Sequence, residues 1–263
     1  MANTQLTLAS DSSTDASAST SPPELNPFSK AYLGLVWDNI KETFTAPAHW
    51  DTCDWLVAGG VVAGIGTVAA FDEDIQRAVQ RNRNSTVDDV FKNIQGFGNE
   101  YAPGVIGAFY LGGMVFDDPN AKSVALDAAS ASIIASGLIL YPLKETVGRA
   151  RPGSNVGAYY FSPFSGHDSF PSGHTTEAFV LATVISEHYH SIWIDIGCYG
   201  IASAVGYARL DLNYHWASDV LAGAAIGTFV GHLVVHVNHN RWGLAVQPIL
   251  GPHMNGAQLC WSF

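Results

Sequence analysis

Positive charge and cysteine are both scarce in this chain. Its 263 residues include 12 Lys and Arg against 23 Asp and Glu, which gives a formal net charge of −11. No nucleic acid partner is expected, because a protein this acidic lacks the basic surface that binding to nucleic acid requires. The three cysteines, Cys53, Cys198 and Cys260, form no CxxC pair and no framework of disulfides, so they do not fix the redox compartment.

The residue groups that hold metal ions are also missing from the sequence. There is no carboxylate cluster of the kind that binds magnesium, and no set of His and Cys with the spacing of a zinc site. Neither a metal nor a cofactor is therefore expected.

Both ends of the chain differ in composition from its middle. The first 23 residues are rich in Ser, Thr, Asp and Ala without an aromatic residue, so residues 1–25 are predicted to be a disordered polar tail. This stretch has no basic start and no long apolar run, so it is not a recognisable signal peptide. A single helical domain is predicted over 26–240, and 241–263 is predicted to be a tail or a short hairpin.

Apolar stretches dominate the middle of the chain. Six of them predict an all-α fold, a helical bundle with six core hydrophobic helices, and they cover residues 55–71, 104–116, 128–143, 178–185, 196–208 and 220–237. Residues 72–95 are amphipathic instead, and Ser85 is a candidate helix cap within them.

Three short segments hold a third of all the positive charge. They are KETVGRARP at 144–152, PSGH at 171–174 and RLDLNYHWASD at 209–219, and they contain four of the twelve Lys and Arg residues. A phosphoryl group in transfer spreads negative charge over its oxygens, so its catalysis depends on positioning and on fixed positive charge. Lys144, Arg151 and Arg209 are the candidates to supply that charge.

The same segments contain groups that bind an anion and transfer a proton. Ser172 and Gly173 precede the apolar run 178–185, so they are predicted to lie at a helix N-terminus, where free amides face anions. His215 and Asp219 are four residues apart and share a helical face. An aspartate that accepts from one imidazole nitrogen leaves the other free to attack phosphorus. His174 is then the candidate general acid.

These segments resemble the type-2 phosphatidic acid phosphatase family, which shares its core with bacterial class A acid phosphatases and vanadium haloperoxidases. The family pattern is K-x6-RP, PSGH and SR-x5-H-x3-D, and the likeness covers about residues 110–240. The usual Ser before Arg209 is Ala208 here, which predicts altered local hydrogen bonding rather than loss of activity. The resemblance implies that His215 forms a phosphohistidine, that Asp219 orients it and that His174 protonates the leaving group. It also implies phosphate binding by Lys144, Arg151, Ser172, Gly173 and Arg209, with no metal.

Two other residues near these motifs have less definite roles. Arg149 fits equally well a cation behind the site and a solvated one. His167 matches no motif position, so no role at the site is expected for it. The remaining histidines are expected to be structural.

The sequence leaves open whether the enzyme is membrane-embedded or soluble. Six hydrophobic helices place all three motifs at one membrane face, as in the integral lipid phosphatases of the family, and favour a multi-pass protein. Several stretches are however shorter than the roughly 20 residues that span a bilayer. A soluble periplasmic bundle, like the secreted acid phosphatases, remains the alternative.

The predicted function is a metal-independent phosphatase that acts on a phosphate monoester or a terminal diphosphate through a phosphohistidine. The expected substrate is a phosphorylated lipid, with a small phosphomonoester as the alternative if the protein is soluble. The resemblance places the site on the periplasmic or exterior side. A vanadium-dependent haloperoxidase, with His215 holding vanadate, and a catalytically inactive anion binder are the other readings. No protein partner can be inferred.

Overall fold

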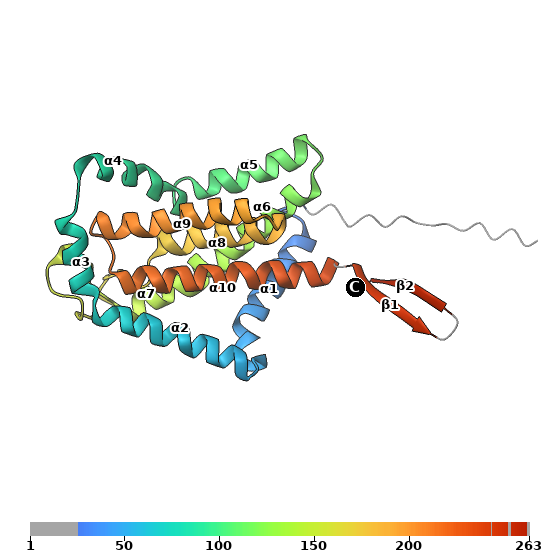
Figure 1. Cartoon of the computed structure of the whole chain (residues 1–263), viewed down its shortest axis with the longest axis horizontal. Coiled ribbons are helices and arrows are strands. Elements are labelled where there is room, and N and C mark those ends of the chain that lie inside the picture. Colours follow the sequence, from blue (N-terminus) through green and yellow to red (C-terminus); the bar gives the residue numbers. More distant parts are fainter. Residues whose placement is uncertain (1–25, 243, 252–253, 262–263) are drawn as a thin grey trace, which may run out of the picture.

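A computed structural model describes residues 26–242, 244–251 and 254–261 of the chain. The tail predicted over residues 1–25 lies outside these residues. The described part is built almost entirely from helices that run side by side along one long axis (Figure 1).

The α-helices of the described residues, in chain order, are α1 (Lys30–His49), α2 (Thr52–Ala70), α3 (Asp72–Arg81), α4 (Ser85–Ile94), α5 (Ala102–Val115), α6 (Pro119–Ser132), α7 (Tyr141–Val147), α8 (Gly173–Tyr189), α9 (Ile192–Asp211) and α10 (Ala217–Trp242). Shorter helical segments are the 3-10 turns η1 (Gln95–Gly98) and η3 (Pro152–Ser154) and the π-helical η2 (Ile133–Leu140), which joins α6 to α7. Two antiparallel strands, β1 (Leu244–Gly251) and β2 (Met254–Trp261), follow α10, with Leu244 opposite Trp261.

Local sequence signals explain where several helices begin. Asp51 accepts from the amide of Asp54, and the Asp54 side chain accepts from the amide of Asp51, so a reciprocal capping box starts α2. Asp118 caps α6, and Pro119 occupies its first turn, where a missing amide hydrogen costs nothing. Helix α8 begins at Gly173 after Ser172, so the PSGH segment lies at a helix N-terminus, as the sequence predicts.

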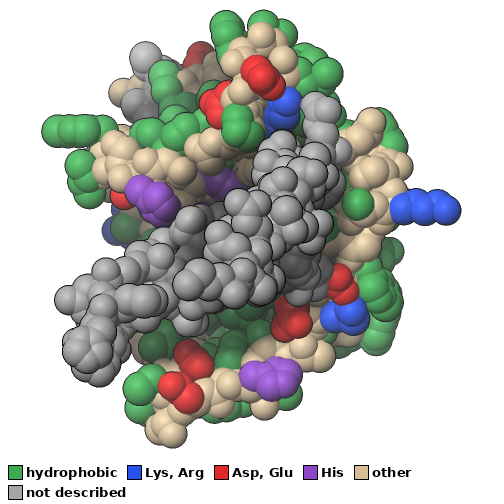
Figure 2. Space-filling model, turned by 90° about the vertical axis from the view of Figure 1, so that its right-hand side faces the viewer, with side chains coloured by type: hydrophobic (Ala, Val, Ile, Leu, Met, Phe, Trp, Pro, Cys, Tyr) green, Lys and Arg blue, Asp and Glu red, His purple; other side chains and the backbone are tan. Residues whose placement is uncertain are grey.

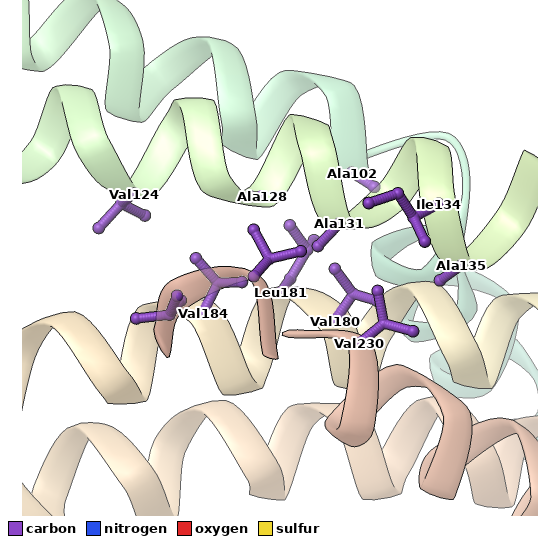
Figure 3. Packing of buried hydrophobic residues seen from close by; sticks show 12 residues of the cluster. Ala102, Val124, Ala128, Ala131, Ile134, Ala135, Val180, Leu181, Val184 and Val230 are labelled. Atoms are coloured by element: carbon purple, nitrogen blue, oxygen red, sulfur yellow. The ribbon is translucent and has the colours of Figure 1, made fainter. Parts of the chain in front are cut away.

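Helix α8 is the central element of the bundle and packs against α6, α9 and α10. Its buried side chains Val180, Leu181 and Val184 meet Ile134 of η2 and Val230 of α10 in one apolar cluster (Figure 3). This packing fixes the N-terminus of α8 relative to the ends of its neighbours.

Glycines let α10 approach α8 unusually closely. A Cβ atom on Gly223 would lie 2.6 Å from the backbone oxygen of Ser172, and one on Gly227 would collide with the backbone oxygen of Thr176. Small residues at helix contacts allow such close backbone packing where apolar burial alone does not drive association, as in membranes. The contact holds the start of α10 against the start of α8.

Within the part of the chain that the structure describes, three helical segments are long and apolar enough to cross a membrane: Thr52–Ala70, Pro119–Val147 and Ala217–His239. Figure 2 looks at the end of the molecule near the C-terminal strands. Hydrophobic side chains gather along the outline there, with charged and histidine side chains on the end face between them. Length, composition and this distribution support a membrane location for the protein.

The all-helical prediction is confirmed. The six apolar stretches lie in α2, α5, the continuous α6–η2–α7 segment, α8, α9 and α10, and the amphipathic stretch 72–95 forms α3 and α4. Only three of the six stretches reach the length and hydropathy of a membrane span. The division of the chain into a tail, one domain over 26–240 and a C-terminal segment stays a prediction.

Candidate active site

The eight predicted site residues gather at one end of the bundle. Lys144 lies on α7, Arg151 in the following loop, and Arg209 near the end of α9. Ser172, Gly173 and His174 begin α8, while His215 and Asp219 flank the start of α10. These elements meet beside α3, at the left in Figure 1.

The start of α8 is held directly against the start of α10. The amide of Ser172 donates to the backbone oxygen of Asp219 at 3.0 Å, and the fully buried Ser172 hydroxyl accepts from Thr175 at 2.9 Å. A Cβ on Gly173 would lie 4.0 Å from the Cε of Lys144, so the Lys144 stem passes over the first turn of the helix. The first amides of α8 and the Lys144 ammonium therefore converge on one place, as an anion site requires.

His215 is almost completely buried and has one defined ring contact. Its Nδ1 lies 2.7 Å from the backbone oxygen of Ser169. Because a carbonyl oxygen can only accept, Nδ1 carries the hydrogen in the neutral ring, and Nε2 is left with a free lone pair. The structure thus assigns to the Ser169 carbonyl the tautomer selection that the sequence attributes to Asp219.

Asp219 lies behind His215, and both of its carboxylate oxygens accept hydrogen bonds. Its Oδ1 accepts from Arg149 Nη1 at 2.6 Å, and its Oδ2 accepts from the Ser169 hydroxyl at 2.6 Å and the Trp216 amide at 2.9 Å. The distance from Oδ2 to Nδ1 of His215 is 3.7 Å, which is beyond a hydrogen bond but within strong electrostatic reach. Asp219 therefore acts on His215 through its charge and through Ser169.

The three predicted phosphate ligands have different surroundings. Lys144 donates to the backbone oxygen of Asp168, and Arg151 forms a two-pronged ion pair with the Asp168 carboxylate at 2.8 and 2.7 Å. Arg209 donates to Gln95, and its guanidinium lies 4.4 Å from the ring centre of Tyr214. The buried Nε of Arg209 has no hydrogen-bond partner within the described residues, so it is a donor available to an anion.

The protonation of the two histidines follows from burial and from the cations. Burial lowers the pKa of His215, although Asp219 opposes this, so the ring is neutral at pH 7. Burial, and then the charges of Arg209, His215, Arg151 and Lys144, lower the pKa of His174 to about 3.

Arg149 is a buried cation behind the site, which settles the alternative that the sequence leaves open. Its Nη2 donates to Asp72 at 2.7 Å, its Nη1 to Ser218 at 2.7 Å and to Asp219, and its Nε to the backbone of Ala158. Its side chain is only 3% exposed. Arg149 therefore anchors Asp219 and does not face the solvent.

A cavity of about 450 Å³ opens next to Arg151. Its lining includes Asp168, His167, Asn213 and Tyr214. His167, which matches no motif, thus lies at the cavity beside Arg151, edge-to-face with Tyr160. Within the described residues, no group of three or more His, Cys, Asp or Glu side chains is placed to hold a metal ion.

Sequence reasoning missed four residues that contact the predicted ones: Asp72, Gln95, Asp168 and Ser169. Asp168 and Ser169 stand just before PSGH, so their position near the motif was a usable signal. Asp72 and Gln95 lie 72 and 49 residues before Lys144, and nothing in their local sequence connects them with the site.

Residues 126–243 match the profile of the PAP2 superfamily. This segment is therefore similar to the PAP2 superfamily. It carries all eight predicted site residues, together with Arg149, Asp168 and Ser169.

Individual relatives of the PAP2 segment include two bacterial enzymes named lipid A 1-phosphatase. The chain is 44% identical over 85 residues to one from Porphyromonas gingivalis, which covers 30% of this chain and 19% of that protein. It is 35% identical over 121 residues to one from Rhizobium etli, and that alignment covers 43% of this chain and 50% of the relative. The chain thus spans half or less of the length of these relatives.

A solved structure shares the fold. The transmembrane PAP2-type phosphatidylglycerolphosphate phosphatase from Bacillus subtilis superposes with a TM-score of 0.53 and 24% identity, over 68% of this chain and 94% of that chain. The described helices therefore have the PAP2 transmembrane phosphatase arrangement.

Proposed function

We propose that this protein is a membrane phosphatase that hydrolyses a phosphate monoester, or the terminal phosphate of a diphosphate, on a lipid through a phosphohistidine on His215. One observation carries the proposal: Nδ1 of the buried His215 is committed to the Ser169 carbonyl, so Nε2 is the nucleophile. The similarity of residues 126–243 to the PAP2 superfamily and the names of the relatives support the same reaction class.

In the first step, the phosphate would bind between the first amides of α8, Ser172, Lys144 and the two arginines. Nε2 of His215 attacks phosphorus, and the bond from phosphorus to the leaving oxygen breaks. The ring becomes positive because Nδ1 keeps its hydrogen, and Asp219 at 3.7 Å offsets that charge.

His174 would supply a proton to the leaving oxygen. Burial, and then the neighbouring charges, lower its pKa to about 3. A phosphate dianion would offset the charges of Arg209, Arg151 and Lys144, so substrate binding raises this pKa and lets His174 acquire a proton. In the second step His174 takes a proton from water, the hydroxide forms a bond to phosphorus, and inorganic phosphate leaves His215.

The substrate follows from the setting of the site. A site at the end of membrane-crossing helices suits a phosphate carried by a lipid headgroup, and a phosphorylated glycolipid such as lipid A is the first candidate because of the relatives' names. We also propose that the site faces the periplasm or the exterior. A cysteine introduced by Ser154→Cys at the cavity, in a chain with Cys53, Cys198 and Cys260 replaced by Ser, should react with a membrane-impermeant maleimide in intact cells.

The direct test is phosphate release by the purified full chain in detergent, with EDTA present. The substrates are lipid A, phosphatidic acid, an isoprenoid diphosphate and p-nitrophenyl phosphate. His215→Ala should abolish release, whereas His232→Ala, which changes an exposed histidine on α10, should not. Rapid acid-free quenching of a ³²P-labelled reaction should trap a phosphate that is stable in base and labile in acid. Release that persists in His215→Ala, or that requires a metal, would refute the proposal.

A further inference from the structure

Asp72, the first residue of α3, is buried beneath the site and bonded to it from outside the PAP2 segment. Its side chain is fully buried. Its Oδ1 accepts from the amide of Ser218 at 2.9 Å, and its Oδ2 accepts from the Ser218 hydroxyl at 2.5 Å and from Arg149 Nη2 at 2.7 Å. Each hydrogen bond to this carboxylate comes from a donor group, so both of its oxygens act as acceptors.

Asp72 and Asp219 share one guanidinium. Arg149 lies between them at 2.7 and 2.6 Å, and the Ser218 hydroxyl accepts from Arg149 and donates to Asp72. The charges of Asp72, Arg149 and Asp219 add to one negative charge. With Arg149 and Asp219 alone the sum would be zero, and little field would remain to offset a positive ring on His215.

We propose that Asp72 is a positioning residue of the active site, which keeps the buried Asp72–Arg149–Asp219 cluster at one net negative charge so that Asp219 can stabilise the positively charged His215 formed on phosphorylation. This inference rests on the proposed function. Asp72 touches neither substrate nor reacting atoms, and it acts through Arg149, Ser218 and Asp219.

Other parts of α3 hold the same end of the bundle. Gln76 donates to the side chain of Asn213 at 2.9 Å, and Gln80 donates to the backbone oxygens of Leu210 and Asp211 at 3.0 Å. Helix α3 therefore braces the turn between α9 and α10 that carries His215, and Asp72 is its buried charged contact.

Variants that change the charge of the cluster distinguish an electrostatic role of Asp72 from a purely structural one. Asp72→Asn brings the cluster to zero and should make His215 harder to protonate. Arg149→Gln brings it to two negative charges and should make His215 easier to protonate. The double variant Asp72→Asn/Arg149→Gln returns to one negative charge and should bring the protonation midpoint of His215 back toward the wild-type value. Other groups also set the level of His215 protonation and are unchanged in all variants; they are Lys144, Asp168, His174, Arg209 and Asp219.

The experiment titrates the ring of His215 by ¹⁵N NMR in the full chain labelled at histidine, with His215→Ala to assign its signals, and measures the pH profile of kcat/KM. The midpoint for His215 and the acid limb of the profile should move to lower pH in Asp72→Asn and to higher pH in Arg149→Gln. We expect kcat/KM of Asp72→Asn to fall about 10- to 100-fold, as when outer partners of a reactive group are lost. Asp74→Asn, on the exposed side of the same turn of α3, is the matched control and should change neither readout.

Each outcome is decisive. Opposite shifts in the two single variants and recovery in the double variant support the proposal. Shifts in the same direction, or activity losses that follow the unfolding temperature without any shift, overturn it. If Asp72→Asn does not fold, the double variant carries the test, because it removes both partners of the Asp72–Arg149 ion pair together, and a midpoint far from that of the wild type then refutes the idea. If the proposed function is wrong, the wild-type protein will show no His215-dependent phosphate release. The NMR titration still measures the effect of the cluster charge on His215 in that case.

Discussion

Asp219→Asn tests which group selects the tautomer of His215. Nδ1 of His215 donates to the Ser169 carbonyl at 2.7 Å, whereas the nearest Asp219 oxygen is 3.7 Å away. The substitution removes the carboxylate charge and leaves that carbonyl in place. We therefore expect the variant to keep the hydrogen on Nδ1 and to lose only the contribution of the charge.

The size of this loss follows from the distance. Two unit charges about 4 Å apart interact by about 4 kcal/mol at an effective dielectric constant of about 20. Since about 1.4 kcal/mol changes a rate tenfold, the charge contributes at most about 10³-fold. Arg149 at 2.6 Å from Asp219 offsets part of the field, so we expect kcat to fall about 10²- to 10³-fold. A wrong tautomer in a Ser–His–Asp triad costs about 10⁴-fold, which is distinguishable.

Stability must be measured alongside activity. The side-chain amide introduced by Asp219→Asn would offer one acceptor oxygen to the three donors that Asp219 now satisfies, so at least one buried donor loses its partner, at a cost of about 1–3 kcal/mol. Thermal unfolding in detergent measures this loss of stability. The rate of phosphate release gives kcat, and ¹⁵N NMR identifies the tautomer of His215. A folded variant with the hydrogen on Nε2, or one as inactive as His215→Ala, would show that Asp219 and not the Ser169 carbonyl fixes the ring.

Three further predictions concern packing, pH and metals. Gly227→Val should force α10 away from Thr176 of α8 and lower stability by about 1–3 kcal/mol in thermal unfolding, whereas Gly200→Ala in the open surface of α9 should not lower it. The acid limb of kcat/KM should lie below pH 6.5, because burial lowers the pKa of His215 and the neutral ring that attacks phosphorus persists as the pH falls; a limb at higher pH would contradict this. Phosphate release should withstand EDTA, and full loss that added Mg²⁺ restores would contradict a metal-free mechanism.

The helices and the position of the motifs could be predicted because both are local in sequence. Apolar stretches of helical length gave α2, α5 and α8 to α10, and the apolar run 178–185 placed Ser172 and Gly173 at the start of α8. The motif residues could be placed together because their spacing puts them at consecutive helix ends. Their chemical roles stay predictions.

The contacts behind the site could not be predicted because they are non-local or made by the backbone. The sequence shows a carboxylate four residues after His215. Only the folded structure shows that the Ser169 carbonyl accepts the hydrogen bond from the ring. Arg149 could be placed only by its partner Asp72, which lies 77 residues earlier in the chain. Single-sequence periodicity contains no signal for such a pair.

Some contacts that hold the candidate site come from residues outside the segment that matches the PAP2 profile. Residues 126–243 carry the proposed reacting groups, yet two side chains that hold them come from before this range: the buried Asp72 fixes Arg149 and Ser218, and the partly buried Gln95 accepts from Arg209. Removing Asp72 would leave Arg149 to neutralise Asp219 alone, and removing Gln95 would free a guanidinium that must face phosphate. Since a buried cation and carboxylate are costly to leave unmatched, the segment on its own is an incomplete site. Helix α3 and the turn η1 are therefore parts of the catalytic structure, although they lie outside the family match.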